Sequence, residues 1–386
     1  MDVSEVAADA VTWRRHLHAH PELSFREHET ARYVHKTLEA FGGLEIERPT
    51  PTSVVARLRG ERPGYTLAFR ADMDALPIQE ESGVAFASCT DGVMHACGHD
   101  GHTAMLLAVA RLLVAQRAEL TGEIRFLFQH AEEVPPGGAA ELVAAGGIDG
   151  VDVVIGCHLI STLDVGKVAA IEGACTAAAD TFSVRIHGRG GHAAFPHETV
   201  DPIAVSAQAI SNLQHIVSRT TSPLDSVVVS VTRITGGTAD NIIPESVELG
   251  GTVRSYREEA RARTRERIAR VLDGVTAAHG ATYEFDYIDG YAPVINDRRL
   301  ATIVREAAGA TRVVDFDPLM AGDDFSAYLR VAPGCFFFVG AGDPNAFPHH
   351  HPRFTIDEGA LPVGIETLVR TALRFLAEGV RPENDA

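Results

Sequence analysis

Short apolar runs alternate with amphipathic stretches along most of the chain. Between residues 65–70 and 123–128, positions 103–120 repeat apolar side chains at the helical period, with Asp100 or Thr103 as the expected N-cap. Residues 139–146 predict a second helix. Strands that alternate with helices indicate an α/β fold with a parallel or mixed sheet. Four runs have the length and composition of its buried strands: YTLAFR (65–70), EIRFLF (123–128), VDVVIG (151–156) and CFFFVG (335–340).

The middle of the chain has a different order of predicted strands and helices. Its order is β-α-β-β-α-β, the split arrangement of a ferredoxin-like sandwich. Because this block falls between the third and fourth buried strands, we predict a discontinuous domain at 1–178 and 290–386 with an inserted domain at 179–289. The elements of the insert are a strand at 181–188, a helix at 200–219, strands at 225–234 and 246–256, a helix at 257–280 and a strand at 281–288.

Polar side chains suited to metal binding follow each of the four buried strands. Ligands of open α/β sheets bind outside the carboxyl ends of the strands, so we expect these side chains to converge there. In chain order they are Asp72 and Asp74; His130, Glu132 and Glu133; Cys157 and His158; and His349, His350 and His351.

The stretch MHACGHDGH, residues 94–102, adds metal-capable side chains just before a predicted helix. Cys97 and His99 point to the same side if this stretch is extended, and Gly98 permits a close approach. A thiolate with imidazoles and carboxylates suits zinc, or less selectively manganese, cobalt or nickel. His95 and His102 either support the ligands or belong to the loop. C-x-H alone is a weak pattern. The metal-site prediction depends on the further metal-capable side chains that follow the four buried strands.

The pair Glu132–Glu133 is expected to divide two roles. Adjacent side chains on an extended segment point apart, so one carboxylate can bind metal while the other acts as a general base. The alternative is two solvated loop glutamates, which the preceding apolar strand and the following PPGGAA disfavour. The N-terminal histidines at 16, 18 and 20 are interpreted as surface or packing residues.

Length, charge and cysteine content narrow the class of protein. A chain of 386 residues exceeds one typical core, which favours two domains. Its 34 Lys+Arg against 52 Asp+Glu give a net charge of −18, which argues against nucleic acid or an anionic membrane as a partner. No apolar run approaches a membrane span, and the N-terminus has no apolar signal core. Five cysteines without a C-x-x-C pair favour a reduced, cytoplasmic setting.

Several motifs in order resemble one enzyme family. They are FRADMDALP, MHACGHDGHTAMLL, HAEE followed by GGA, GGTADNIIPESVELGGTVRS and HHHPRF. Together they resemble the metal-dependent aminoacylase and peptidase family, and within it the amidohydrolase branch of hippurate hydrolase and the plant indoleacetyl-amino-acid hydrolases. The resemblance runs from RRHLHAHPELSFRE (14–27) to TIDEGALPVG (355–364). It implies a catalytic domain with two divalent metals and an inserted lid domain, which in this family commonly carries a homodimer contact.

The resemblance also implies a role for each motif residue. Glu132 would be the general base, and Asp74 would orient a metal ligand. In the lid, His192 would polarise the scissile carbonyl, while Asn241 and Arg254 would bind the substrate carboxylate. For Asp74, His192 and Arg254 the plainer alternatives are a turn residue, a loop histidine and an exposed strand arginine. The implied metal ligands, with Cys97 as the bridge, are Cys97, His99, Glu133, His158 and His350.

The expected activity is hydrolysis of an N-acyl amino acid to a carboxylic acid and a free amino acid. A dipeptidase or carboxypeptidase with the same metal site is the alternative within enzymes. A non-catalytic binding protein of this fold is a further alternative, but such a protein would have lost the base or a ligand, and all of those positions are filled here. The expected assembly is a homodimer or a higher homo-oligomer.

Overall fold

The computed structural model describes residues 3–378, which divide into two compact units. Unit 1 contains the chain up to Cys175, Ile295–Asp317 and the chain from Asp324 on, and unit 2 contains Thr176–Val294 and Pro318–Asp323. The sequence prediction places Pro318–Asp323 in the first domain. In the structure this segment joins unit 2, because the Ala177 amide donates to the carbonyls of Leu319 and Ala321.

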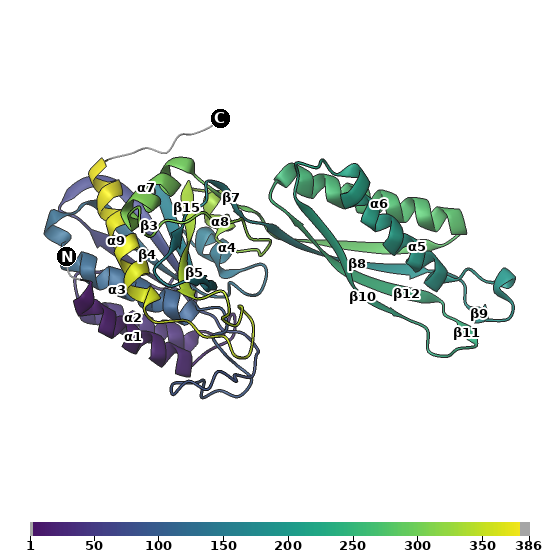
Figure 1. Ribbon diagram of the computed structural model, residues 1–386, viewed down its shortest axis with the longest axis horizontal. Coiled ribbons are helices and arrows are strands. Elements are labelled where there is room, and N and C mark those ends of the chain that lie inside the picture. The colour runs from purple at the N-terminus through teal and green to yellow at the C-terminus, as the bar shows by residue number, and fades with distance from the viewer. Residues whose placement is uncertain (1–2, 379–386) are drawn as a thin grey trace. The chain divides into compact units, whose positions relative to one another are not determined.

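Unit 1 is built on a mixed seven-stranded sheet in the order β1-β2-β4-β3-β5-β15-β6 (Figure 1). The four strands predicted from apolar runs are its central neighbours, and they are mutually parallel. They are β3 (Arg62–Asp72), β4 (Thr121–Gln129), β5 (Val153–Asp164) and β15 (Gly334–Gly342). Antiparallel strands complete the edges: β1 (Glu45–Glu47), β2 (Val54–Arg59) and β6 (Val168–Ala169).

Helices cover this sheet and enclose one apolar core. The central one, α3 (His99–Val114), is buried along most of its length because it contacts the sheet as well as α1 and α9. A helix in such a position needs apolar side chains on nearly every side. The other helices of unit 1 are α1 (Ser4–Ala19), α2 (His28–Phe41), α4 (Gly138–Ala144), α7 (Arg298–Ala308), α8 (Ser326–Leu329) and α9 (Ala360–Glu378).

The start of α3 differs from the prediction. The helix begins at His99, with Gly98 rather than Asp100 or Thr103 at the N-cap, and Gly98 has a left-handed φ of 90°. The stretch from Cys97 to His99 is therefore a turn into a helix, so the condition of an extended stretch, under which Cys97 and His99 would point to one side, is not met. A glycine adopts this backbone without the strain that a Cβ would add.

Strand β5 is longer than the prediction. It pairs with β3 only as far as Gly156, opposite Arg70, but it continues along β15, where Phe338 lies opposite His158. Cys157 and His158 therefore lie within the strand, beyond the point where β3 leaves it.

Unit 2 has its own core and a four-stranded antiparallel sheet in the order β10-β12-β8-β13. Its principal elements follow the predicted β-α-β-β-α-β order. They are β8 (Ala178–His187), α5 (Pro202–His215), β10 (Val227–Gly236), β12 (Ser246–Ser255), α6 (Glu258–His279) and β13 (Thr282–Tyr291) (Figure 1).

Shorter elements complete the described chain. In unit 2, β9 (Gly191–His192) pairs with β11 (Ile242–Ile243). A separate pair, β7 (Gly173–Thr176) with β14 (Val294–Asn296), has most of its residues in unit 1. Between residues 3 and 378, no helix combines the length and apolarity that a membrane crossing needs.

Candidate metal centre and active site

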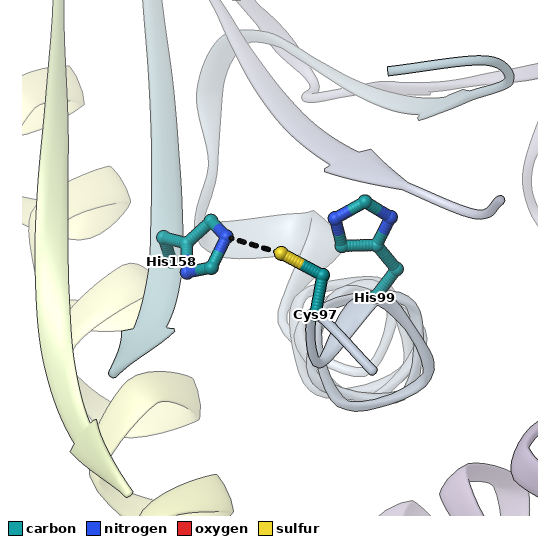
Figure 2. Close-up of side chains that lie close together, drawn as sticks. All are labelled: Cys97, His99 and His158. Carbon is teal, nitrogen blue, oxygen red and sulfur yellow. Dashed lines mark hydrogen bonds between the residues drawn. The ribbon is translucent and has the colours of Figure 1, made fainter. Parts of the chain in front are cut away.

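Three predicted ligands meet where α3 begins beside β5. Cys97 and His99 come from the turn into α3, and His158 comes from β5; their ligand atoms lie within 4.8 Å of one another. Figure 2 shows the Cys97 sulfur between the two imidazoles. Cys97 Sγ is 3.5 Å from His158 Nε2. A thiol and two imidazoles at this separation form part of a metal-binding donor set.

A second group shares the same sulfur. Cys97, Glu133 and His350 also have ligand atoms within 4.8 Å of one another, and His350 Nε2 is 3.2 Å from Glu133 Oε1. Cys97 is thus common to two groups that together contain all five predicted ligands. A shared thiolate is the arrangement that a bridge between two cations requires.

Hydrogen bonds orient the two imidazoles toward the centre. His99 Nδ1 donates to the Asp74 backbone carbonyl at 3.0 Å and lies 3.2 Å from Asp74 Oδ1, and His158 Nδ1 donates to the Leu159 carbonyl at 2.8 Å. Each ring therefore turns Nε2 toward the centre, and Nε2 is the nitrogen that would bind a metal. His99 Nε2 is buried without a hydrogen-bond partner among the described residues, and Glu133 Oε1 lies 3.9 Å from it and 3.2 Å from His350 Nε2. A cation between these atoms would give His99 Nε2 a partner.

The charges around the centre also favour a cation. Burial opposes a charge on His99, yet Asp72, Asp74 and Glu133 raise the pKa of its imidazole to about 10. Burial, followed by Glu133 and Glu132, raises the pKa of the Cys97 thiol well above its usual value. The carboxylates thus create a negative field at the thiol and the imidazole, although Arg70 pairs with Asp72 behind them. Metal binding would release the thiol proton and add positive charge within this field.

The three consecutive histidines differ in what they bind. His349 Nε2 accepts the Ser161 amide at 3.3 Å, and its Nδ1 faces Cys97 Sγ at 3.7 Å. His351 Nδ1 accepts the Arg353 amide. Only the His350 ring lies against Glu133. This division agrees with the choice of His350 as the ligand.

The Glu132–Glu133 pair departs from the sequence prediction in its geometry. Both carboxylates come within 4.8 Å of His99 and of each other instead of pointing apart. The reason is the backbone: Ala131 has a left-handed φ of 49°, and a bend replaces the expected extended segment. Glu132 is buried, with 7% of its surface exposed. The pair is therefore not two solvated loop glutamates.

Comparison with known proteins decides the family. The model of peptidase family M20/M25/M40 matches residues 68–374. The chain belongs to this family. The predicted resemblance is thereby confirmed, and it extends over both units.

Relatives within the family carry amidohydrolase and peptidase names. The chain is 58% identical to an N-acyl-L-amino acid amidohydrolase of Geobacillus stearothermophilus, over 76% of this chain and 80% of that protein. It is 39% identical to thermostable carboxypeptidase 2 of Saccharolobus solfataricus, over 97% of each chain. Among solved structures, a Bacillus subtilis dinuclear metal binding peptidase of the M20 family matches with a TM-score of 0.86 and 38% identity, covering 97% of this chain and 99% of that one.

The three predicted residues of unit 2 do not form one group. His192 and Asn241 are neighbours, because β9 pairs with β11 and the Ala193 amide donates to the Asn241 carbonyl. Ser246, at the start of β12, pairs with His187, which is close in sequence to His192. Arg254 lies near the end of β12, opposite Ala179. The eight residue steps from Ser246 to Arg254 span roughly 26 Å. Asn241 and Arg254 of one chain therefore cannot bind the same small carboxylate.

Local contacts define the donors that these unit 2 residues offer. His192 Nδ1 accepts the Ala194 amide at 3.1 Å, which leaves the Nε2 hydrogen as a donor on an exposed ring. Arg254 Nη1 is bonded to the carbonyls of Val253 and Asp180. The geometry of His192 suits the stabilisation of a developing oxyanion.

Sequence reasoning missed Arg70 and Asp324, which belong to a buried network behind the ligands. Arg70 donates to Asp72 Oδ2 at 2.6 Å and to Asp324 Oδ1 at 2.7 Å. His102 lies 2.6 Å from Asp72 through Nδ1 and accepts the Leu159 amide through Nε2 at 2.8 Å. His102 is thus a supporting residue rather than a ligand. The available signals were an arginine inside an otherwise apolar strand and the i, i+3 spacing of His99 and His102, which places them on one helix face.

Proposed function

We propose that this chain is a metal-dependent amidohydrolase that cleaves N-acyl amino acids to a carboxylic acid and a free amino acid. The observation that supports this most strongly is the pair of ligand groups that share Cys97 beside the buried carboxylate of Glu132. The amidohydrolase relative at 58% identity supports the substrate class.

The proposed metal ligands are the five residues of the two groups, Cys97, His99, Glu133, His158 and His350, holding two divalent ions. A thiolate with imidazoles and a carboxylate is a donor set for zinc, and manganese, cobalt or nickel are the other candidates. When bound, such ions lower the pKa of water and polarise a carbonyl oxygen.

Glu132 is the proposed proton carrier. Its carboxylate takes a proton from the water that adds to the amide carbon, and it returns that proton to the nitrogen when the carbon–nitrogen bond breaks. Asp74 holds His99 by its Nδ1 hydrogen and accepts the Glu133 amide at 3.0 Å. One buried carboxylate thereby fixes the position of two ligands.

Unit 2 is the proposed ferredoxin-like lid and the proposed homodimer element. In this proposal His192 donates to the oxyanion, while Asn241 and Arg254 bind the substrate carboxylate. Because these residues lie at opposite ends of β12, they can serve one small substrate only if two copies contribute. We therefore propose a homodimer in which the ends of the lid sheet come from different chains.

Mixed dimers test this assembly. E132Q and H192A should each be inactive alone, and a refolded mixture should regain activity because one site in each mixed dimer has both intact residues. Sedimentation must show dimers. A mixture that forms dimers and stays inactive would rule out the exchange of His192 between copies.

The five free cysteines fit a reducing compartment, so a cytoplasmic location remains part of the proposal.

The substrate class is tested by incubating metal-loaded protein with a mixed panel of N-acyl amino acids and dipeptides and measuring released amino acids by mass spectrometry. A chelated sample is the control. Chelator-sensitive cleavage of the acyl conjugates is expected. No cleavage of any panel member by protein with two bound metals would show that the proposed substrate class is wrong.

A carboxypeptidase is the second candidate, supported by the relative of that name at 39% identity. Preferential cleavage of the dipeptides in the same panel would favour it. The metal site and the role of Glu132 would be unchanged in that case.

A further inference from the structure

We propose that Glu27 is a positioning residue for the general base, acting on Glu132 through the backbone of the residue before it. This inference rests on the proposed role of Glu132. It concerns the motif HPELSFRE, which contributes no metal ligand.

The peptide segment around Glu132 is held from both sides by buried carboxylates. The Ala131 amide donates to Glu27 Oε1 at 2.8 Å, and the Glu133 amide donates to Asp74 Oδ2 at 3.0 Å. Glu132 itself lies between these two anchored amides. Its backbone is therefore fixed by two side chains from distant parts of the sequence.

The anchored segment has a backbone that needs such support. Ala131 has a φ of 49°, a left-handed conformation that costs an alanine free energy. Phe25, which donates its own amide to Glu27 Oε1 at 3.1 Å, has a φ of 64°. The Phe25 ring also packs edge-on against His130, with centroids 5.7 Å apart. Two strained residues thus face each other across the Glu27 carboxyl group.

The same N-terminal segment also contacts the other anchor. Ser24 Oγ donates to Asp74 Oδ2 at 2.7 Å, the oxygen that accepts the Glu133 amide. Residues 24–27 therefore connect Asp74 with the segment that carries the base and a proposed ligand. A contact of this kind keeps a base in its productive geometry.

Burying the carboxyl group of Glu27 costs free energy, and this cost indicates that the group has a function. Its side chain is fully buried, and Oε2 has no hydrogen-bond partner among the described residues. Burial and then Asp74 raise the pKa of its carboxyl group to about 8. A neutral acceptor such as a glutamine amide should therefore replace it with little loss, whereas an apolar side chain should not.

The test compares E27M and E27Q in metal-loaded protein. E27M removes the acceptor of the Ala131 amide and should lower kcat about 10- to 100-fold with KM nearly unchanged, because displacing a base acts on the chemical step. E27Q keeps an acceptor and should retain kcat within about threefold of the wild type. E22M is the matched control, because Glu22 lies in the same segment and accepts the Thr30 amide, whereas the Ala131 amide donates to Glu27.

Metal content and thermal unfolding of each variant show whether the site and the fold persist. If E27M does not fold, the comparison of E27D with E27Q replaces it as the test, because aspartate keeps the carboxyl group but moves it away from the Ala131 amide. The expected result is then a lower kcat for E27D only. Wild-type kcat in E27M, or in E27D when E27M does not fold, would overturn the proposal, as would an equal loss of kcat in E22M.

Hydrogen exchange separates this proposal from the proposed function. E27M, or E27D in its place, should speed exchange of the Ala131 amide relative to E27Q even if the wild type cleaves no N-acyl amino acid. Unchanged exchange at Ala131 would overturn the positioning role. An inactive wild type with the expected exchange difference would instead overturn the proposed substrate class alone.

Discussion

The hydrogen bond on one ring nitrogen decides whether a histidine can serve as a metal ligand. His99 and His158 donate from Nδ1 and keep Nε2 for a cation, whereas His102 uses both nitrogens within the protein. His351 accepts a backbone amide through Nδ1, which places its ring hydrogen on Nε2, whereas the Nε2 of His350 faces Glu133.

The adjacent pair His350 and His351 provides a controlled prediction. H350A should lower the affinity for at least one metal by more than about 100-fold, since loss of a ligand should exceed the 10- to 100-fold effect typical of a supporting residue. H351A should keep the wild-type metal content. Metal analysis after dialysis at limiting metal concentration measures both. Equal metal content in the two variants would contradict the assignment of His350.

At the scale of elements, α1 is held against the start of α3 by buried charges. Arg14 Nε donates to Asp100 Oδ2 at 2.9 Å, and His18 lies between the same oxygen and Glu80. Asp100 directly follows His99, so this contact fixes the end of the helix that presents two proposed ligands. His18 is thus a buried packing residue, while His16 and His20 are exposed.

This contact predicts a pH dependence of stability. Burial opposes a charge on His18, but Asp100 and Glu80 raise its pKa from 6.5 to about 9. A raised pKa stabilises the fold fully below pH 6.5, and that contribution is lost as the pH rises toward 9. The wild-type free energy of unfolding should therefore fall by up to about 3 kcal/mol more than that of H18Q over this range. Urea denaturation of both proteins at several pH values measures the difference.

The exposed His20 supplies the control for that measurement. H20Q should follow the wild-type pH profile. Parallel profiles for the wild type and H18Q would show that His18 is not charged in the folded protein.

The sequence supports prediction of some elements better than others, for physical reasons. Parallel strands buried on both faces are continuous apolar runs, so β3, β4, β5 and β15 stand out locally. The start of α3 depends on the left-handed φ of Gly98, which composition does not encode. Motif resemblance identified the five proposed ligands, and the structure brings them together.

Contacts between distant residues account for most of what the sequence did not reveal. Asp100 pairs with His18 across 82 positions, and Glu27 reaches Ala131 across 104. No local period links such residues. The bend at Ala131, which brings Glu132 and Glu133 together, is likewise anchored by distant residues, Glu27 and Asp74.

At the scale of the whole molecule, the two units have separate cores, and all five proposed ligands lie in unit 1. They come from four separated segments: the turn into α3, the bend after β4, strand β5 and the loop after β15. Metals bound there would cross-link these segments in the native state only, which stabilises that state by mass action.

Hydrogen exchange should therefore respond to metal in one unit. Metal loading should slow exchange in residues 97–103 and 130–134 of unit 1, relative to chelated protein. Exchange in α6 and β10 of unit 2 should be unchanged and serves as the internal control. Equal slowing in both units would contradict the expectation that metal stabilises the protein by cross-linking the four segments of unit 1.

The most direct test of the account is the activity of E132Q with its metals in place. The variant should bind two metal ions per chain and unfold as the wild type does, while its kcat for N-acyl amino acids falls by about 100-fold or more, since proton transfer by a positioned base contributes about 10²–10⁴-fold. Wild-type turnover by metal-loaded E132Q would contradict the role of Glu132 and with it the proposed mechanism.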